Sequence, residues 1–141
     1  MSAVRYLADT SALARLIHRR DAAEQWQKRV DAGLVSVCPP VELELLYTAR
    51  SAANRRKLST VLRGAFTWVP APDDVFERAR EVQAALTNRG THRSAGPVDL
   101  LIAATAEAHD LTLLHYDRDY ECVAEVTGQE ILWLAAPGSL N

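Results

Sequence analysis

Acidic side chains follow apolar segments at several places in this chain, and their type and positions suit chemistry on a phosphate ester. Asp9 comes directly after one short apolar run, and Asp117 comes after another. Glu44 and Asp99 lie in the first turns of predicted helices. Each acid taken singly could instead cap a helix, occupy a turn or face solvent. Their value for catalysis therefore depends on whether the fold brings them together.

The pattern of apolar residues predicts short strands alternating with helices. The expected strands are 4–8, 34–38, 66–69, 111–115 and 130–134. The expected helices are 11–18, 21–32, 41–53, 55–63, 74–88 and 98–109, with a short one inside 117–125 and a loop at 90–97. This alternation predicts an α/β domain with a central, mostly parallel five-stranded sheet and helices on both faces.

In such a sheet the four acids fall at the carboxyl edge, where ligands of open α/β sheets bind. Four carboxylates at one edge repel each other, and a divalent cation removes that repulsion. Oxygen ligands suit Mg²⁺ or Mn²⁺, and the four scattered histidines and two distant cysteines offer no zinc spacing. Among the histidines, only His92 and His115 lie near segments of the expected site.

Composition sets the broad class of the protein. The 141 residues fit a single domain, 1–141, with 136–141 as a flexible tail. Apolar residues make up 48%, which is enough for a real core, and the net charge of −2 decides nothing about nucleic acid. No apolar run is long enough to span a membrane, and Cys38 and Cys122 lack disulfide-framework spacing. A reduced, cytoplasmic protein without a membrane partner is expected.

A carboxylate-held Mg²⁺ suits phosphodiester hydrolysis, because it activates water and stabilises charge on the leaving oxygen. Several arginines lie close in sequence to the acids and are candidates for binding RNA phosphates. These are Arg50, Arg55, Arg56, Arg89 and Arg93. A solvated helix face explains the same arginines equally well.

Four segments in order resemble the PIN-domain family, and within it the VapC-type toxins of bacterial toxin–antitoxin pairs. The segments are LADTSAL at the start, ELLYTAR from Glu44, DLLIAATA from Asp99 and LLHYDRDY around Asp117. The resemblance covers nearly the whole chain. It implies a metal-dependent endoribonuclease that cuts RNA, is inhibited by a VapB-type antitoxin and forms a homodimer.

The resemblance also implies roles for individual residues. Asp9, Asp99 and Asp117 would hold Mg²⁺ or Mn²⁺ directly or through water, and Glu44 would orient a water or help to hold a second ion. The accessory residues would be Thr10 or Ser11, whose hydroxyl supports Asp9, and Asp119, a further acid. We favour Glu44 over the nearby Glu42.

The chain departs from the common family pattern at three positions. His115 and Tyr120 stand where the family often has Thr and Phe, and Thr48 stands where glycine is frequent. These changes affect the fine geometry of the expected site and leave its carboxylates in place.

Other functions fit the sequence less well. A phosphatase that works through an aspartyl intermediate favours an acid two residues after the first, where this chain has Ser11. A receiver domain needs a phosphate-accepting Asp after a later strand, and neither Val69 nor Pro70 supplies one. The remaining alternative is a non-catalytic RNA-binding or protein-interaction module with the same fold. Metal titration separates it from the enzyme.

Overall fold

The computed structural model describes residues 3–141 and builds them into five strands and seven helices. The strands are β1 (Tyr6–Ala8), β2 (Val35–Val37), β3 (Thr67–Trp68), β4 (Thr112–His115) and β5 (Ile131–Trp133). The helices are α1 (Thr10–His18), α2 (Arg20–Asp31), α3 (Pro39–Tyr47), α4 (Ala52–Ala65), α5 (Val75–Asn88), α6 (Pro97–Ala108) and α7 (Tyr120–Thr127).

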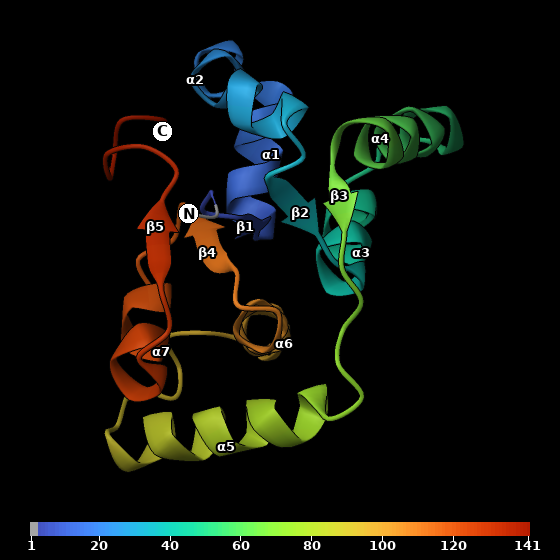
Figure 1. Ribbon diagram of the computed structural model, residues 1–141. Coiled ribbons are helices and arrows are strands. Elements are labelled where there is room, and N and C mark those ends of the chain that lie inside the picture. The colour runs from blue at the N-terminus through green and yellow to red at the C-terminus, as the bar shows by residue number, and fades with distance from the viewer. Residues whose placement is uncertain (1–2) are drawn as a thin grey trace.

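All five strands pair in parallel, in the order β3-β2-β1-β4-β5. Successive strands β1 to β3 extend the sheet in one direction, and β4 and β5 extend it from β1 in the other. Helices α1 and α2 lie on one side of the sheet in Figure 1, and α5 and α6 lie on the other. The predicted α/β class, with a parallel five-stranded sheet and helices on both faces, is confirmed.

This strand order places the topological switch between β1 and β4, because the chain leaves β1 toward β2 and later returns to the opposite side of β1. The two strands pair in register, with Leu7 opposite Leu113 and Ala8 opposite Leu114. Their carboxyl ends therefore lie side by side. In open α/β sheets a crevice for ligands forms at this point.

The core surrounds the central strands. Leu7, Leu113 and Leu114 are fully buried, as expected for short parallel strands covered on both faces. Helix α6 is apolar nearly all round, and it packs against both α5 and β4. Trp26 of α2 is also buried, and its indole Nε1 donates a hydrogen bond to the Leu134 carbonyl at 3.0 Å.

The expected helix 41–53 is shorter in the structure, because α3 ends at Tyr47 and a new helix begins at residue 52. The Thr48 hydroxyl donates to the Leu45 carbonyl at 2.6 Å, within the last turn of α3. Ser51 is extended, and its hydroxyl accepts a hydrogen bond from the Asn54 amide at 3.0 Å. Side chains that bond nearby backbone groups favour such breaks.

Residues near the C-terminus contact the rest of the domain. Leu140 is 8% exposed, its amide donates to the Tyr116 hydroxyl at 2.8 Å, and its carbonyl accepts from Arg19 Nη1 at 2.9 Å. These contacts fall in the segment 136–141 that the sequence leaves as a tail. Within residues 3–141, no helix has both the length and the apolar character needed to cross a bilayer.

Candidate acidic site

Asp9 lies at the carboxyl end of β1 and caps helix α1. Its side chain is 2% exposed. The Ser11 hydroxyl lies 2.7 and 2.9 Å from its two oxygens, and the Ala12 amide donates to Oδ1 at 2.9 Å. Burial raises the pKa of Asp9 to about 6, although these hydrogen bonds act in the opposite direction. The protein thus holds a buried carboxylate whose charge is costly until a cation or a proton compensates it.

Ser11 also connects the ends of β1 and β4. Its hydroxyl oxygen accepts a hydrogen bond from the Tyr116 amide at 2.9 Å, directly after β4. One small side chain therefore orients Asp9 and fixes the neighbouring strand end. Of the two hydroxyls expected to support Asp9, that of Ser11 does so.

Thr10 supports a different acid. Its hydroxyl donates to Glu44 Oε1 on α3, so the start of α1 is joined to the second turn of α3. Glu42, the rival of Glu44, points elsewhere and pairs with Arg63 on α4 at 3.2 Å. The structure therefore places Glu44, not Glu42, beside the residue that follows Asp9.

Asp99 sits in the first turn of α6, where its Oδ2 accepts a hydrogen bond from the Gly96 amide at 3.1 Å. Its other oxygen, Oδ1, accepts one from the Tyr120 hydroxyl at 3.1 Å. Tyr120 is 1% exposed, and its hydroxyl also lies close enough to Asp9 to lower the pKa of that carboxyl. Burial, followed by the charges of Asp9 and Asp99, raises the pKa of Tyr120 well above its ordinary value. The hydroxyl therefore stays protonated and available as a donor.

Asp117 and Asp119 form the turn after β4. The Asp119 amide donates to Asp117 Oδ1 at 2.9 Å. Partial burial, followed by the charges of Asp117 and Asp99, raises the pKa of Asp119 above its ordinary value. This influence indicates that the two acids of the turn after β4 and Asp99 of α6 share one region of negative potential.

His115 lies beneath this turn and is fully buried. Its Nδ1 accepts a hydrogen bond from the Asp117 amide at 3.2 Å, and its Nε2 has no hydrogen-bond partner among residues 3–141. The ring packs against Tyr120 and Trp133, and burial lowers its pKa. His115 thus shapes the turn as a neutral side chain, whereas His92 is exposed on the loop before α6.

The donor set is compatible with a hard divalent cation. No group of three or more His, Cys, Asp or Glu side chains within residues 3–141 is already arranged to hold a metal ion. Mg²⁺ does not need one, because it commonly binds one or two carboxylates and keeps several waters. The raised pKa values of Asp9 and Asp119 are what a cation at this edge would relieve. The carboxylate oxygens of Asp9, Asp99 and Asp117 are thus the type of donor that Mg²⁺ and Mn²⁺ prefer.

Two residues near the acids are not evident from the sequence as site residues. Tyr120 stands out only as Tyr where the resembling family often has Phe. Arg15 lies one turn along α1 from Ser11, and its Nη1 donates to the Ser11 carbonyl at 3.0 Å. Its guanidinium stacks on the Tyr116 ring at 4.2 Å. This contact forms because α1 packs beside the end of β4, so the sequence alone does not indicate it.

The arginines expected to bind RNA divide into two groups. Arg50, Arg55 and Arg56 are exposed in the turn before α4 and on α4 itself, and within residues 3–141 they form no ion pair. Arg89 pairs with Glu125 at 3.4 Å, and Arg93 is exposed on the loop before α6. Within residues 3–141, four of the five therefore keep their charge free for an anionic ligand, and only Arg89 shares its charge with an acid.

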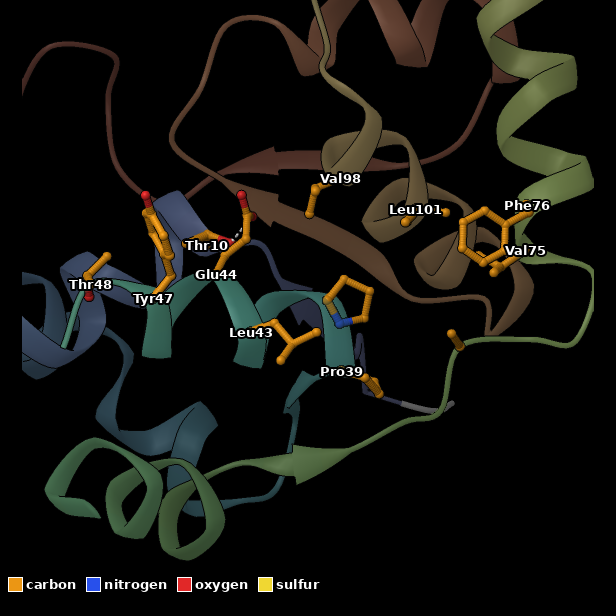
Figure 2. A pocket seen from close by; sticks show the side chains of 12 residues that line it. Thr10, Pro39, Leu43, Glu44, Tyr47, Thr48, Val75, Phe76, Val98 and Leu101 are labelled. Atoms are coloured by element: carbon orange, nitrogen blue, oxygen red, sulfur yellow. Dashed lines mark hydrogen bonds between the residues drawn. The ribbon is translucent and has the colours of Figure 1, made fainter. Parts of the chain in front are cut away.

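An apolar groove of about 700 Å³ adjoins the Thr10–Glu44 pair. Figure 2 shows Leu43, Glu44 and Tyr47 projecting from α3 on one side of it, opposite side chains of α5 and α6. Leu43 is 65% exposed, Tyr47 90% and Phe76 60%. Large apolar side chains gathered around a concave surface are typical of a site that another molecule covers.

Comparison with known proteins places this chain in a family. The model of the PIN domain matches residues 6–126, so the chain belongs to the PIN domain family. Ribonuclease VapC21 of Mycobacterium tuberculosis is 42% identical over 135 residues, which cover 96% of this chain and 97% of that protein. Ribonuclease VapC2 of the same species is 39% identical over 131 residues and covers 92% of each chain.

Solved structures share the fold. The chain is similar to one in DNA-bound VapBC from Salmonella typhimurium, with a TM-score of 0.73 and 19% identity over 94% of this chain and all of the other. VapBC2 from Rickettsia felis, bound to a promoter DNA fragment, gives a TM-score of 0.76 and 18% identity, over 92% of this chain and 98% of the other. At these identities the likeness establishes the fold only.

Proposed function

We propose that this protein is a Mg²⁺- or Mn²⁺-dependent endoribonuclease and the toxin of a VapBC-type toxin–antitoxin pair. The observation that carries the proposal is the set of acids around the carboxyl ends of β1 and β4, three of which are each bonded by a hydroxyl: Glu44 by Thr10, Asp9 by Ser11 and Asp99 by Tyr120. Membership of the PIN domain family and relatives named Ribonuclease VapC support it.

Each residue has a role in hydrolysis that follows from its contacts. Asp9, Asp99 and Asp117 would hold the cation, which activates water and stabilises charge on the leaving oxygen. Ser11 and the Ala12 amide fix the Asp9 carboxylate, so that little reorganisation is needed when a phosphate arrives. The Thr10 hydroxyl fixes one oxygen of Glu44 and leaves the other to orient the attacking water.

The partners follow from the relatives and from the surface. The structural neighbours were solved as VapBC assemblies, so we propose a VapB-type antitoxin as the protein partner of this chain. The apolar groove between α3 and α5 is suited to a protein partner, and it lies next to Glu44. We also propose that the chain forms a homodimer, which would bury exposed apolar side chains like those around this groove.

RNA cleavage by the purified protein tests the proposal. The protein is freed of metal with EDTA, incubated with total bacterial RNA, and assayed with and without Mn²⁺. Cleavage should require Mn²⁺, and Asp99→Asn should lower its rate by at least roughly a hundredfold, since it removes a charge that acts in the transition state.

The matched control is Asp110→Asn, an exposed acid in the turn between α6 and β4, at the opposite end of the strand. Asn tolerates the positive φ of 53° at this position, so the variant should fold and keep full activity. Equal activity of all three proteins, or cleavage that persists in EDTA, would refute the assignment.

A non-catalytic RNA-binding module remains the second candidate. The lack of a ready-made group of three metal ligands within residues 3–141 favours it. A thermal-stability titration with Mn²⁺ separates the two functions, because a cation that binds only the folded protein raises its melting temperature. RNA binding without any such rise, and without cleavage, identifies the module.

A further inference from the structure

A second hollow shares Thr10 with the acidic site. It has a volume of about 470 Å³ and lies between α1 and α4, next to the end of α3. We call it the α1–α4 cleft. Thr10 and Thr48 line both this cleft and the apolar groove. Because Thr10 donates a hydrogen bond to Glu44, both hollows open beside the same acid.

The two hollows differ in charge. The apolar groove has no Lys, Arg or His in its lining, and Glu44 is its one charged residue among those that the structure describes. The α1–α4 cleft is lined by Arg50 and His18 and by the polar side chains of Thr48 and Asn54. An RNA strand that leaves the acids must place its next phosphate somewhere, and phosphates are bound mainly by cations. Of the two hollows, only the cleft has an arginine among the described residues of its lining.

Arg50 is held by its backbone while its side chain stays free. The Arg50 amide donates to Asn54 Oδ1 at 3.1 Å, and the Asn54 amide donates to the Ser51 hydroxyl at 3.0 Å. These two bonds fix the turn between α3 and α4. The Arg50 side chain is exposed and forms no ion pair within residues 3–141. An arginine with a fixed backbone and an unpaired guanidinium is well suited to bind phosphate.

We propose that the α1–α4 cleft binds the nucleotide next to the scissile phosphate of a single-stranded RNA, with Arg50 on its phosphate. The inference rests on the proposed ribonuclease function and adds where the neighbouring nucleotide of the substrate lies. Residues of α1 and α4 line the cleft, and the proposed occupant is one flexible, unpaired strand. Thr48, Asn54 and His18 provide donors and acceptors for the base or ribose, as in recognition of unpaired RNA.

Binding measurements test the cleft separately from cleavage. Fluorescence anisotropy with a short single-stranded oligoribonucleotide of mixed sequence is measured on the inactive Asp99→Asn protein over a range of salt concentrations. Adding Arg50→Ala should weaken binding roughly tenfold at low salt and reduce the slope of log K against log salt by about 0.7, the value of one phosphate contact on a single strand. Arg50→Lys should keep the slope, because lysine retains the charge.

The control is Arg5→Ala, which removes an exposed arginine before β1, at the amino edge of the sheet. It should change neither affinity nor slope. If Arg5→Ala and Arg50→Ala weaken binding equally, the attraction is nonspecific and the proposed RNA-binding role of the cleft is refuted. An unchanged salt slope in Arg50→Ala would refute it as well. Absence of RNA cleavage by the wild-type protein would instead refute the proposed function, since the binding test does not depend on cleavage.

Discussion

Replacing Asp9 by Asn should stabilise the metal-free protein at neutral and higher pH. Burial raises the pKa of Asp9 from 3.8 to about 6. Each pKa unit corresponds to about 1.4 kcal/mol, so ionising this buried carboxyl lowers the free energy of unfolding by about 3 kcal/mol. The side chain is 2% exposed, so solvent screening does not reduce this value much.

The sign of the pH dependence follows from the direction of the shift. The folded protein holds the Asp9 proton more tightly than the unfolded chain, so this contribution to stability is fully present below pH 3.8 and is lost as the pH rises to about 6. Asn carries no charge at any of these pH values. Wild type and Asp9→Asn should therefore be about equally stable near pH 4, and above pH 7 the variant should be more stable by about 3 kcal/mol, or roughly 10 °C in melting temperature.

Urea denaturation in EDTA, measured at several pH values for both proteins, gives this difference directly. Other titrating groups, His115 among them, are present in both proteins and largely cancel. Adding Mn²⁺ should reverse the order, because the cation binds the folded wild type more tightly than the variant. A variant that is equally or less stable than wild type at pH 8 in EDTA would refute the assignment of Asp9 as a strained, buried carboxylate.

Two further substitutions test the hydroxyls that bond the acids. Tyr120→Phe removes the hydroxyl that donates to Asp99 and should lower the stability of the metal-free protein by about 1 kcal/mol. The loss is small because Asp99 is partly exposed and regains a hydrogen bond to water. An unchanged urea midpoint would show that this hydrogen bond does not contribute to stability. Ser11→Ala leaves Asp9 and the Tyr116 amide each without a partner, so it should destabilise by about 2 kcal/mol. That loss should be larger at pH 8 than at pH 4, because the hydroxyl stabilises the ionised carboxylate. If urea denaturation shows the same loss of stability at both pH values, Ser11 does not stabilise the ionised carboxylate of Asp9.

The positions of the acids could be predicted because local sequence determines them. Asp9 follows a buried strand and is followed by small hydroxyl residues, and Asp99 follows Pro97 at the start of an apolar helix. Parallel pairing then brings strand ends together without any knowledge of side-chain packing. Local signals of this kind were enough for the fold class and for the placement of Glu44 beside the site.

Features that depend on tertiary contacts could not be predicted in this way. The hydroxyl of Tyr120 meets Asp99 only because α7 packs under the start of α6, and nothing near residue 120 in sequence indicates it. The break between α3 and α4 depends on a serine cap within an otherwise helical pattern, and it creates the turn that carries Arg50. The α1–α4 cleft therefore could not be predicted from the sequence without knowing where α3 ends and α4 begins.

The most direct test of the central claim is the source of the oxygen in the cleavage product. The acids are proposed to promote attack of water on phosphorus, with no part for the ribose 2′-hydroxyl as nucleophile. RNA cleaved by the wild-type protein with Mn²⁺ in oxygen-18 water should carry one labelled oxygen on the new terminal phosphate, analysed by mass spectrometry. A 2′,3′-cyclic phosphate without label would contradict the account, because it shows that the 2′-hydroxyl attacked.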